Sequence, residues 1–322
     1  MSYRTFFALT REPFSSDLHL SDILQTPELI AVKERFDYAL RLGAMALVTG
    51  DIGSGKSTAL RYAIGQLHPS EYVTFYLTAS SGSILELYRQ ILAELSLQSA
   101  GTSRATLTKL IKREIQELVL GKKMKVSLVI DEASLLRLDV FQELHTLTQF
   151  EGDSKPYLPI ILAGQSHLID KLSYRTSQPL ASRIIARSHL EGVNRQDMEQ
   201  YIRHHLAIAG VKKTPFDPAA LTAIHQGSGG IFRKANHLAR GALIAAARQK
   251  CATVTSDHVR LASTEVFSNP CHKKRDRGWY LNQPRSKQSD NQSLGPNHRE
   301  NISPFNVKIH NGVAAGWFCP ML

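Results

Sequence analysis

The sequence contains few of the residues that cross-link small secreted proteins. Only three of its 322 residues are cysteines, and all three lie in the last quarter of the chain. This excludes a disulfide framework and makes a cytoplasmic protein the expectation. The chain has no apolar run of roughly 18 residues, which argues against a transmembrane helix and a membrane partner. The opening residues, Met1-Ser2-Tyr3-Arg4, also lack the apolar segment of a secretory signal.

Acidic residues are the minority among the charged side chains. The 28 Asp and Glu residues stand against 39 Lys and Arg residues, so the net charge is +11. Such an excess fits a polyanionic partner such as nucleic acid, and it fits ordinary solvated basic surfaces equally well. The excess is uneven, because residues 268–322 contain eight basic and three acidic residues. The first 267 residues therefore carry only +6.

The chain begins with a lead-in over residues 1–42 that has little strand character. Thr26 and Pro27 have the residue types of a helix N-cap and first turn, and they predict a helix that runs to about Leu42. The apolar residues of this helix recur at the spacing of one helical face. They are Leu29, Val32, Phe36 and Leu40.

Apolar strands alternate with amphipathic helices over residues 43–192. Strands are expected at 44–49, 72–77, 125–130, 159–163 and 186–190, with helices at 56–67, 84–95, 105–120 and 140–150. This alternation predicts an α/β core with a parallel sheet that is flanked by helices. Residues 193–266 contain helical patterns only, at 194–209, 217–225, 231–250 and 256–264, and predict a small helical lid domain. Residues 267–322 lose all periodicity, and their basic, polar composition predicts a disordered tail.

The strongest motif follows the first predicted strand and precedes a helix. It reads Gly50-Asp51-Ile52-Gly53-Ser54-Gly55-Lys56-Ser57 and continues into Thr58. Two glycines that flank four residues, followed by Lys-Ser, form the phosphate-binding loop of P-loop NTPases. The glycines let backbone N–H groups surround phosphates, while Lys56 reaches the terminal phosphates and Ser57 ligates Mg²⁺. The alternative is a glycine-rich turn without a ligand.

A second motif is the pair of acids that ends the third predicted strand. Asp131 and Glu132 follow the apolar run 126–130 directly. After a phosphate-binding loop, the first acid of such a pair holds Mg²⁺ and the second polarises the attacking water. The alternative interpretation is a surface acid, with Asp131 as the N-cap of the next helix.

Four further polar residues stand at element ends. Gln165 comes after the strand at 159–163 and is either an amide placed near the terminal phosphate or an ordinary polar loop residue. Arg183 and Arg187 lie between a helix and the last strand, either as a finger for a neighbouring subunit's nucleotide or as surface arginines. Arg233 lies in the first turn of a helix, where a cation opposes the helix dipole and a phosphate would offset it.

Cysteine and histidine spacings match no metal site. Cys271 and Cys319 have no partner pair at finger spacing. The neighbours His204 and His205 are expected on a solvated helix edge.

These motifs, in this order, resemble those of the AAA+ ATPases over about residues 3–266. The resemblance is greatest to the ExeA-like group, also called general secretion pathway protein A-like, whose relatives include transposition helper ATPases of the TniB and TnsC kind. Besides the phosphate loop and the acid pair, the matching segments are residues 6–14, 162–165, 201–210 and 230–236.

The resemblance implies a role for each motif residue. Lys56 and the backbone of residues 53–58 hold the phosphates of ATP, and Ser57 and Asp131 serve Mg²⁺. Glu132 activates water. The resemblance also assigns Gln165 to the first sensor position, Arg233 to the second, and Arg183, with Arg187 in reserve, to a finger that acts in trans. A finger in trans implies a homo-oligomer with ATP sites between subunits.

Three functions are consistent with this sequence. The leading hypothesis is an oligomeric ATPase that associates with duplex DNA and recruits or activates a transposase. The second is a secretion-pathway ATPase without a membrane anchor. The third is a scaffold that binds ATP with little turnover, which the presence of Glu132 disfavours.

Overall fold

The computed structural model describes residues 2–97 and 103–267, so the predicted tail lies almost wholly outside the described residues. Five strands form one sheet in the order β2-β3-β4-β1-β5. Every neighbouring pair is parallel, which confirms the predicted α/β fold with a parallel sheet. The strands are β1 (Met45–Gly50), β2 (Tyr72–Thr78), β3 (Lys125–Asp131), β4 (Ile160–Gly164) and β5 (Ile184–Leu190).

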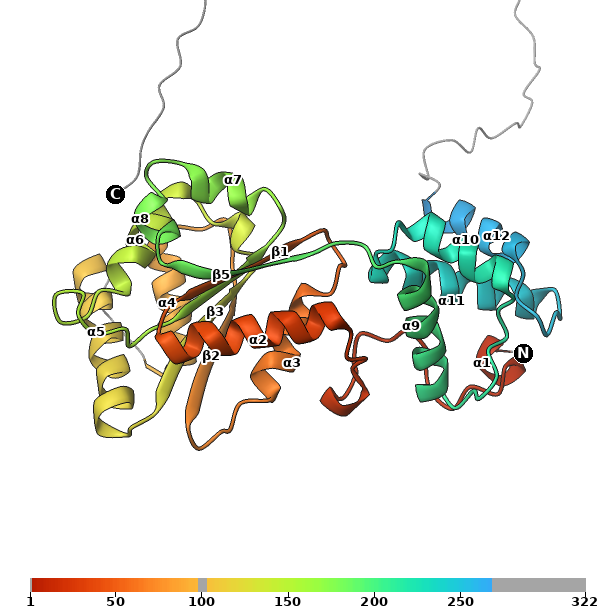
Figure 1. Ribbon diagram of the computed structural model, residues 1–322, viewed down its shortest axis with the longest axis horizontal. Helices are drawn as coiled ribbons and strands as arrows, with labels where there is room; N and C mark the ends of the chain where they lie inside the picture. Colours follow the sequence, from red (N-terminus) through yellow and green to blue (C-terminus); the bar gives the residue numbers. More distant parts are fainter. Residues whose placement is uncertain (1, 98–102, 268–322) are drawn as a thin grey trace, which may run out of the picture. The chain divides into compact units, whose positions relative to one another are not determined.

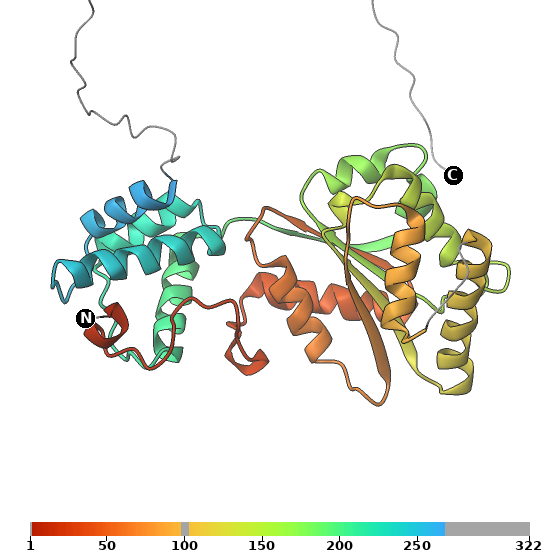
Figure 2. The ribbon, with the colours of Figure 1, turned by 180° about the vertical axis from the view of Figure 1, so that it is seen from behind.

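Helices cover both faces of this sheet. On one face, seen in front in Figure 1, α2 (Pro27–Leu42) and α3 (Lys56–Gly65) share an apolar cluster with β1, β4 and β5. On the other face, seen in Figure 2, a second cluster joins the strands to the remaining helices of the core. These are α4 (Ile84–Glu94), α5 (Arg104–Gln116), α6 (Leu138–Leu147), α7 (Leu168–Ser173) and α8 (Gln178–Ala181). The central strands are therefore buried on both faces, as their continuous apolar runs predict.

Helix α2 forms as its sequence predicts. The Thr26 side chain accepts a hydrogen bond from the backbone N–H of Leu29 at 3.3 Å, and Pro27 occupies the first turn. The helix ends at Gly43, which adopts the left-handed conformation with φ +62°. The four predicted apolar residues are all buried, with Phe36 only 1% exposed. Cap signals and apolar spacing together thus determine this helix.

Other boundaries differ from the expectation. The helix expected over residues 105–120 ends at Gln116 and continues as one π-helical turn, η2 (Glu117–Gly121). Lys122 N–H there bonds to the carbonyl of Glu117, five residues earlier, at 3.0 Å. A helix was expected before Arg183 without stated bounds, and α8 is that helix. Helix α7 and the short turns α1 (Tyr3–Phe6), η1 (Leu20–Asp22) and η3 (Ala133–Leu135) were not predicted. Elements of six residues or fewer are too short to show a helical period.

Four helices after residue 193 form a separate apolar core. They are α9 (Arg195–Ile208), α10 (Pro218–Ser228), α11 (Phe232–Arg248) and α12 (Ser256–Phe267). The lead-in contributes Leu9 and Phe14 to this core, whereas its later residues from Ile23 onward pack against the sheet. Thr10 N–H bonds to the carbonyl of Ala209 at 2.9 Å. Within residues 2–97 and 103–267, no helix has the length and apolar character to cross a membrane.

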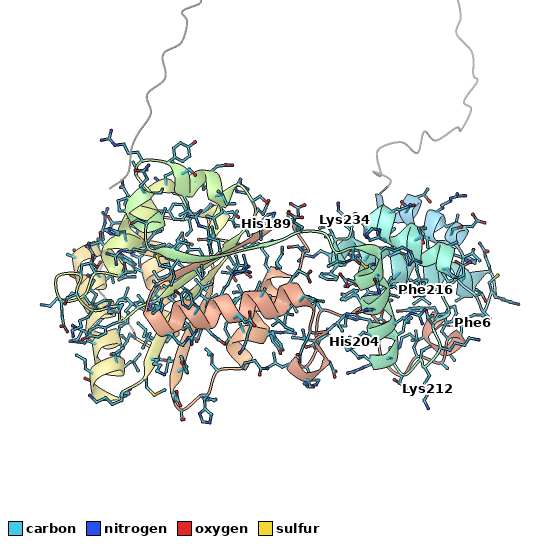
Figure 3. The ribbon with its side chains drawn as sticks, viewed as in Figure 1. Phe6, His189, His204, Lys212, Phe216 and Lys234 are labelled. Carbon is cyan, nitrogen blue, oxygen red and sulfur yellow. The ribbon has the colours of Figure 1, made fainter. Side chains whose placement is uncertain are left out.

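The expectation for the histidine pair of α9 is wrong for His205. Its ring is buried, 3% exposed, and stacks on Phe14 with 5.5 Å between ring centroids. Tyr201 contacts the same ring at 4.4 Å. His204, labelled in Figure 3, places its Nε2 2.7 Å from the carbonyl oxygen of Asp22. Residues of the lead-in cover this face of α9. The sequence of α9 alone does not show that its histidine face is covered by a distant segment.

Stability should depend on pH through His205. Burial, with a smaller effect of His204, lowers the pKa of His205 from 6.5 to about 4. The unfolded chain then binds more protons than the folded chain between these two values. The contribution of the neutral, buried His205 to the free energy of unfolding is therefore complete above about pH 6.5 and is lost as the pH falls toward 4. We expect the thermal midpoint to fall through this window in the wild type and to fall less in His205→Phe.

The exposed His237 on α11 is a matched control. His237→Gln should keep the wild-type pH profile of the thermal midpoint. Identical acid slopes for His205→Phe and the wild type would contradict the assignment.

Candidate functional site

The glycine-rich loop joins β1 to α3 at the carboxyl edge of the sheet. Gly53 and Gly55 have φ values of +86° and +101°, which L side chains rarely adopt. These glycines turn the chain so that α3 begins at Lys56. The backbone N–H groups of this first turn have no partner within the helix, so they form an anion-binding end. Asp51 and Ile52 lie exposed on the crest of the loop.

The start of α11 approaches this loop closely. The backbone N–H of Arg233 donates to the carbonyl of Gly53 at 3.2 Å. A Cβ on Gly53 would lie 2.4 Å from the Cβ of Arg233, so only glycine fits there. The hydroxyl of Ser54 is buried and has no hydrogen-bond partner within the described chain. The loop therefore contains a buried hydroxyl group, that of Ser54, that makes no hydrogen bond to the described residues.

Lys56 is buried inside the loop. Its Nζ donates to the carbonyls of Gly50 at 2.9 Å and Asp51 at 2.8 Å. Burial lowers the pKa of Lys56, and the carboxylates of Glu132 and Asp131 oppose that shift. The ammonium thus lies between the loop and the acid pair, as a lysine that reaches phosphates requires.

Asp131 joins the acid-bearing strand to the phosphate loop. The Ser57 hydroxyl donates to Asp131 Oδ2 at 2.6 Å, across 74 residues of sequence. Asp131 Oδ1 accepts the backbone N–H of Glu132 at 2.8 Å. Asp131 is not the N-cap of the following turn, because that position falls on Glu132. The alternative interpretation of Asp131 as a helix cap therefore does not apply.

Glu132 has a strained backbone. Its φ of +53° and ψ of +31° place a non-glycine residue in the left-handed region, which costs of the order of 1 kcal/mol or more. Such strain occurs preferentially at functional sites. The residue is half-buried and lines the same cavity as Lys56. Among described residues, no hydrogen bond to its carboxylate is found.

Tyr76 is a member of this cluster that the sequence analysis missed. Its hydroxyl donates to Asp131 Oδ2 at 2.6 Å from the neighbouring strand β2. Burial and the bond to Asp131 raise the pKa of Tyr76, so the hydroxyl stays protonated. The sequence held only a weak signal for this role. Tyr76 stands between the apolar residues Phe75 and Leu77, in a strand whose neighbour and register were unknown. Only the register of β2 on β3 aims this side chain at the acid.

Gln165 lies where the sequence analysis expected it, directly after β4. Strand β4 pairs with both β3 and β1, so Gln165 follows the strand between the acid pair and the phosphate loop. Its backbone N–H donates to Ser134 Oγ at 3.4 Å. Gln165 therefore lies at the carboxyl edge of the sheet, but it is not among the residues that line the cavity beside the loop.

The two arginines near β5 differ in their environments. Arg183 precedes β5 and donates from one nitrogen to both carboxylate oxygens of Asp153, at 2.6 and 2.5 Å. This guanidinium lowers the pKa of Asp153. Arg187 lies in the middle of β5, opposite Leu47 in register, and is exposed. Neither arginine lies at the carboxyl edge where the loop is.

A cavity of about 450 Å³ opens beside the loop. Its lining includes residues 53–59, Glu132 and Arg233, together with apolar and aromatic groups. The apolar and aromatic groups come from the lead-in and from helices α9 and α11, and none was assigned to the site from the sequence. They include Phe14, Ile23, Tyr201, His205 and Phe232. The volume suits a small-molecule ligand, to which the lining offers both the glycine-rich loop and aromatic side chains.

These residues fit both ATP and Mg²⁺. For ATP, the loop offers a helix N-terminus, Lys56 and the orphaned hydroxyl of Ser54. For Mg²⁺, Ser57 and Asp131 supply hydroxyl and carboxylate oxygens, the ligand types that this cation prefers.

Comparisons with known proteins agree with this geometry. Residues 41–172 match the AAA domain family. General secretion pathway protein A from Aeromonas hydrophila is 34% identical over 276 residues, which make up 82% of this chain. The chain spans 48% of that relative's length.

Solved structures share the fold at low identity. Cdc6p from Pyrobaculum aerophilum aligns with a TM-score of 0.62 at 16% identity, over 79% of this chain and 70% of that one. ORC2 from Aeropyrum pernix aligns with a TM-score of 0.60 at 14% identity, over 78% and 71% of the two chains. Residues 41–172 therefore belong to the AAA domain family, and the chain shares the fold of these AAA+ neighbours.

Proposed function

We propose that this chain binds ATP and hydrolyses it with Mg²⁺, and that it does so as a homo-oligomer. The observation that carries the proposal is the convergence of Ser57, Asp131 and Lys56 on one edge of the sheet, with Glu132 beside them. A glycine-rich turn without a ligand would not need a buried lysine opposite two acids. Burial of Lys56 without a phosphate partner also costs free energy that binding of an anion offsets.

Each residue of the loop has a defined task in this proposal. The backbone of residues 50–58 and Lys56 hold the triphosphate, while Ser57 and Asp131 hold the metal. Mg²⁺, when bound, neutralises charge on the phosphates. Arg233 extends from the first turn of α11 toward the same cavity, so it suits the second sensor position. The Gln165 amide suits the first sensor position.

Glu132 is the proposed general base. It follows the magnesium-site acid directly and lines the cavity, and no described side chain donates to its carboxylate. A carboxylate in that state is available to accept a proton from a water that attacks the terminal phosphate. This observation also favours an ATPase over a scaffold with little turnover.

Arg183 is the proposed finger, and it acts on a neighbouring subunit. Ile184, next to it, pairs with Met45 at the amino end of β1, whereas Gly50 at the other end pairs with Leu190. At about 3.3 Å per residue, Arg183 lies roughly 20 Å from the phosphate loop of its own subunit. Arg187 is closer along the strand but exposed on its edge. A finger in trans requires ATP sites between subunits.

The partner that we propose is duplex DNA, in a helper role that recruits or activates a transposase. Structural neighbours include Drosophila ORC bound to DNA and Aeropyrum pernix ORC1 in complex with DNA. In this chain, residues 103–125 contain seven basic and two acidic residues, a net charge of +5. Most of the excess positive charge of the first 267 residues therefore falls in this segment, which runs from α5 through η2 to the start of β3.

Some basic side chains of this segment are paired within the chain, and others are exposed and free to contact DNA phosphates. Arg104 is paired with Glu143, and Lys112 Nζ donates to the carbonyl of Gln149 at 2.7 Å. Lys109 and Arg113 are exposed on α5. Exposed cations on phosphates give sequence-tolerant binding that weakens with salt.

A secretion role is the second candidate, because the 34% identical relative is named for that pathway. It predicts an ATPase that duplex DNA does not stimulate and that binds no duplex at low salt. The ATPase rate with and without duplex DNA, together with duplex binding at low salt, therefore separates the two candidates.

Glu132→Gln should lower the rate of ATP hydrolysis at least about 100-fold, because it removes the proton acceptor. ATP affinity should stay near the wild-type value, and the protein should accumulate as an ATP-bound oligomer. Turnover by phosphate release and oligomer size by light scattering check this. The exposed Glu94→Gln is the control. Wild-type turnover in Glu132→Gln would remove this residue from the mechanism.

Arg183→Ala should lower the maximal ATPase rate about 1,000-fold at unchanged ATP affinity, whereas Arg187→Ala should have a small effect. Mixing tests the action in trans. Lys56→Ala subunits lack a working loop but retain Arg183, so adding them to Arg183→Ala subunits should restore activity. No recovery in the mixture, with both variants assembled, would contradict a finger in trans.

The double variant Lys109→Glu, Arg113→Glu should weaken duplex binding at least tenfold at low salt and leave the basal ATPase rate unchanged. The control reverses Lys212, labelled in Figure 3, and Lys213, both exposed on the loop between α9 and α10. Fluorescence anisotropy with a labelled duplex measures both. Equal affinity of the two double variants would place the DNA surface elsewhere.

A further inference from the structure

One polar contact of the acid cluster has no part in the roles assigned above. Tyr76 reaches Asp131 from β2, an edge strand of the sheet. In register, Tyr76 pairs with Val129, and Thr78 pairs with Asp131. The tyrosine side chain therefore runs along the strand direction for two residues and ends at the carboxylate. A shorter side chain at this position would not reach it.

Asp131 is almost saturated with donors. Its Oδ2 accepts the hydroxyls of Ser57 and Tyr76, each at 2.6 Å, and its Oδ1 accepts the N–H of Glu132 at 2.8 Å. A carboxylate offers about four acceptor positions, so about one remains. Since Asp131 is buried, 5% exposed, its side chain has little freedom once these three bonds form. These three hydrogen bonds therefore fix the plane of the Asp131 carboxylate and the direction of its one remaining acceptor position.

The three donors do not have the same origin. Ser57 belongs to the phosphate loop and Glu132 to the acid pair, so both belong to the machinery already described. Tyr76 is the only one of the three from outside it. The neighbouring polar pair on the same face, Thr74 and Ser127, joins β2 to β3 at 2.8 Å without reaching the acid. Tyr76 therefore does more than link the strands.

We propose that Tyr76 is a positioning residue for the magnesium site, acting through Asp131. The inference rests on the proposed function and extends it to a residue outside the motifs. The Tyr76 hydroxyl holds Oδ2 against Ser57, so that the two protein groups that serve the cation keep one arrangement before it binds. Hydrogen-bond partners of metal-site carboxylates typically contribute 10- to 100-fold to metal affinity.

The test is Tyr76→Phe, which removes only the hydroxyl. Binding of a fluorescent ATP analogue is titrated with Mg²⁺ and is also measured in EDTA. We expect the Mg²⁺ concentration for half-maximal enhancement of binding to rise about tenfold. Affinity in EDTA should stay at the wild-type value, because the loop itself is unchanged.

Tyr72→Phe is the matched control on the same strand. The Tyr72 hydroxyl accepts from Lys125 Nζ at 3.3 Å, away from the acid cluster. This variant should keep the wild-type Mg²⁺ midpoint. A wild-type midpoint in Tyr76→Phe would overturn the proposal. Equal losses in EDTA and in Mg²⁺ would also overturn it, because they indicate a general structural defect.

Asp131→Asn separates this inference from the proposed function. If Mg²⁺ enhances binding in the wild type but not in Asp131→Asn, the magnesium site stands, and the result for Tyr76→Phe then decides only the role of Tyr76. If the wild type shows no Mg²⁺-dependent nucleotide binding, the proposed function itself fails.

Discussion

The parallel pairing of five strands is the constraint on which the candidate site depends. Parallel strands present their carboxyl ends at one edge, so the loop after β1, the acid pair at the end of β3 and Gln165 after β4 all lie at that edge. The bond between Ser57 and Asp131 then ties helix α3 to β3 across that edge. Because β4 lies between β3 and β1, the strand order sets the distance between the loop and the acid pair. Lys56 and Glu132 line one cavity.

The same constraint keeps Arg183, the proposed finger, away from the phosphate loop of its own chain. Arg183 stands at the amino end of β5, and the parallel sheet keeps it a strand length from the loop. Its present partner is Asp153, which lies in a turn where Glu151, Gly152 and Asp153 all have positive φ. In the proposed function, Arg183 would thus leave the carboxylate of Asp153 and bind a phosphate of the neighbouring subunit's nucleotide instead. The sheet geometry makes assembly and catalysis interdependent in the proposed function.

The segments outside the sheet complete the cavity. Phe14 from the lead-in stacks on the buried His205 of α9, and the start of α11 contacts the loop through Gly53. Glycine is required at that contact because any Cβ would collide with Arg233. The cavity is therefore lined both by the glycine-rich loop, which is one motif, and by aromatic side chains from segments about 190 residues apart in the chain (14 and 205).

The sequence by itself determined the parts that depend on local order. Helix α2 follows from its cap and apolar spacing, and the phosphate loop follows from glycine positions that permit positive φ. The acid pair was identified because a buried apolar strand ends there. Tyr76, His205 and the Arg183–Asp153 pair were not predictable, since each depends on strand register or on packing between distant segments. Only the tertiary structure decided these contacts, because hydrogen bonds and burial act between groups that local sequence patterns do not connect.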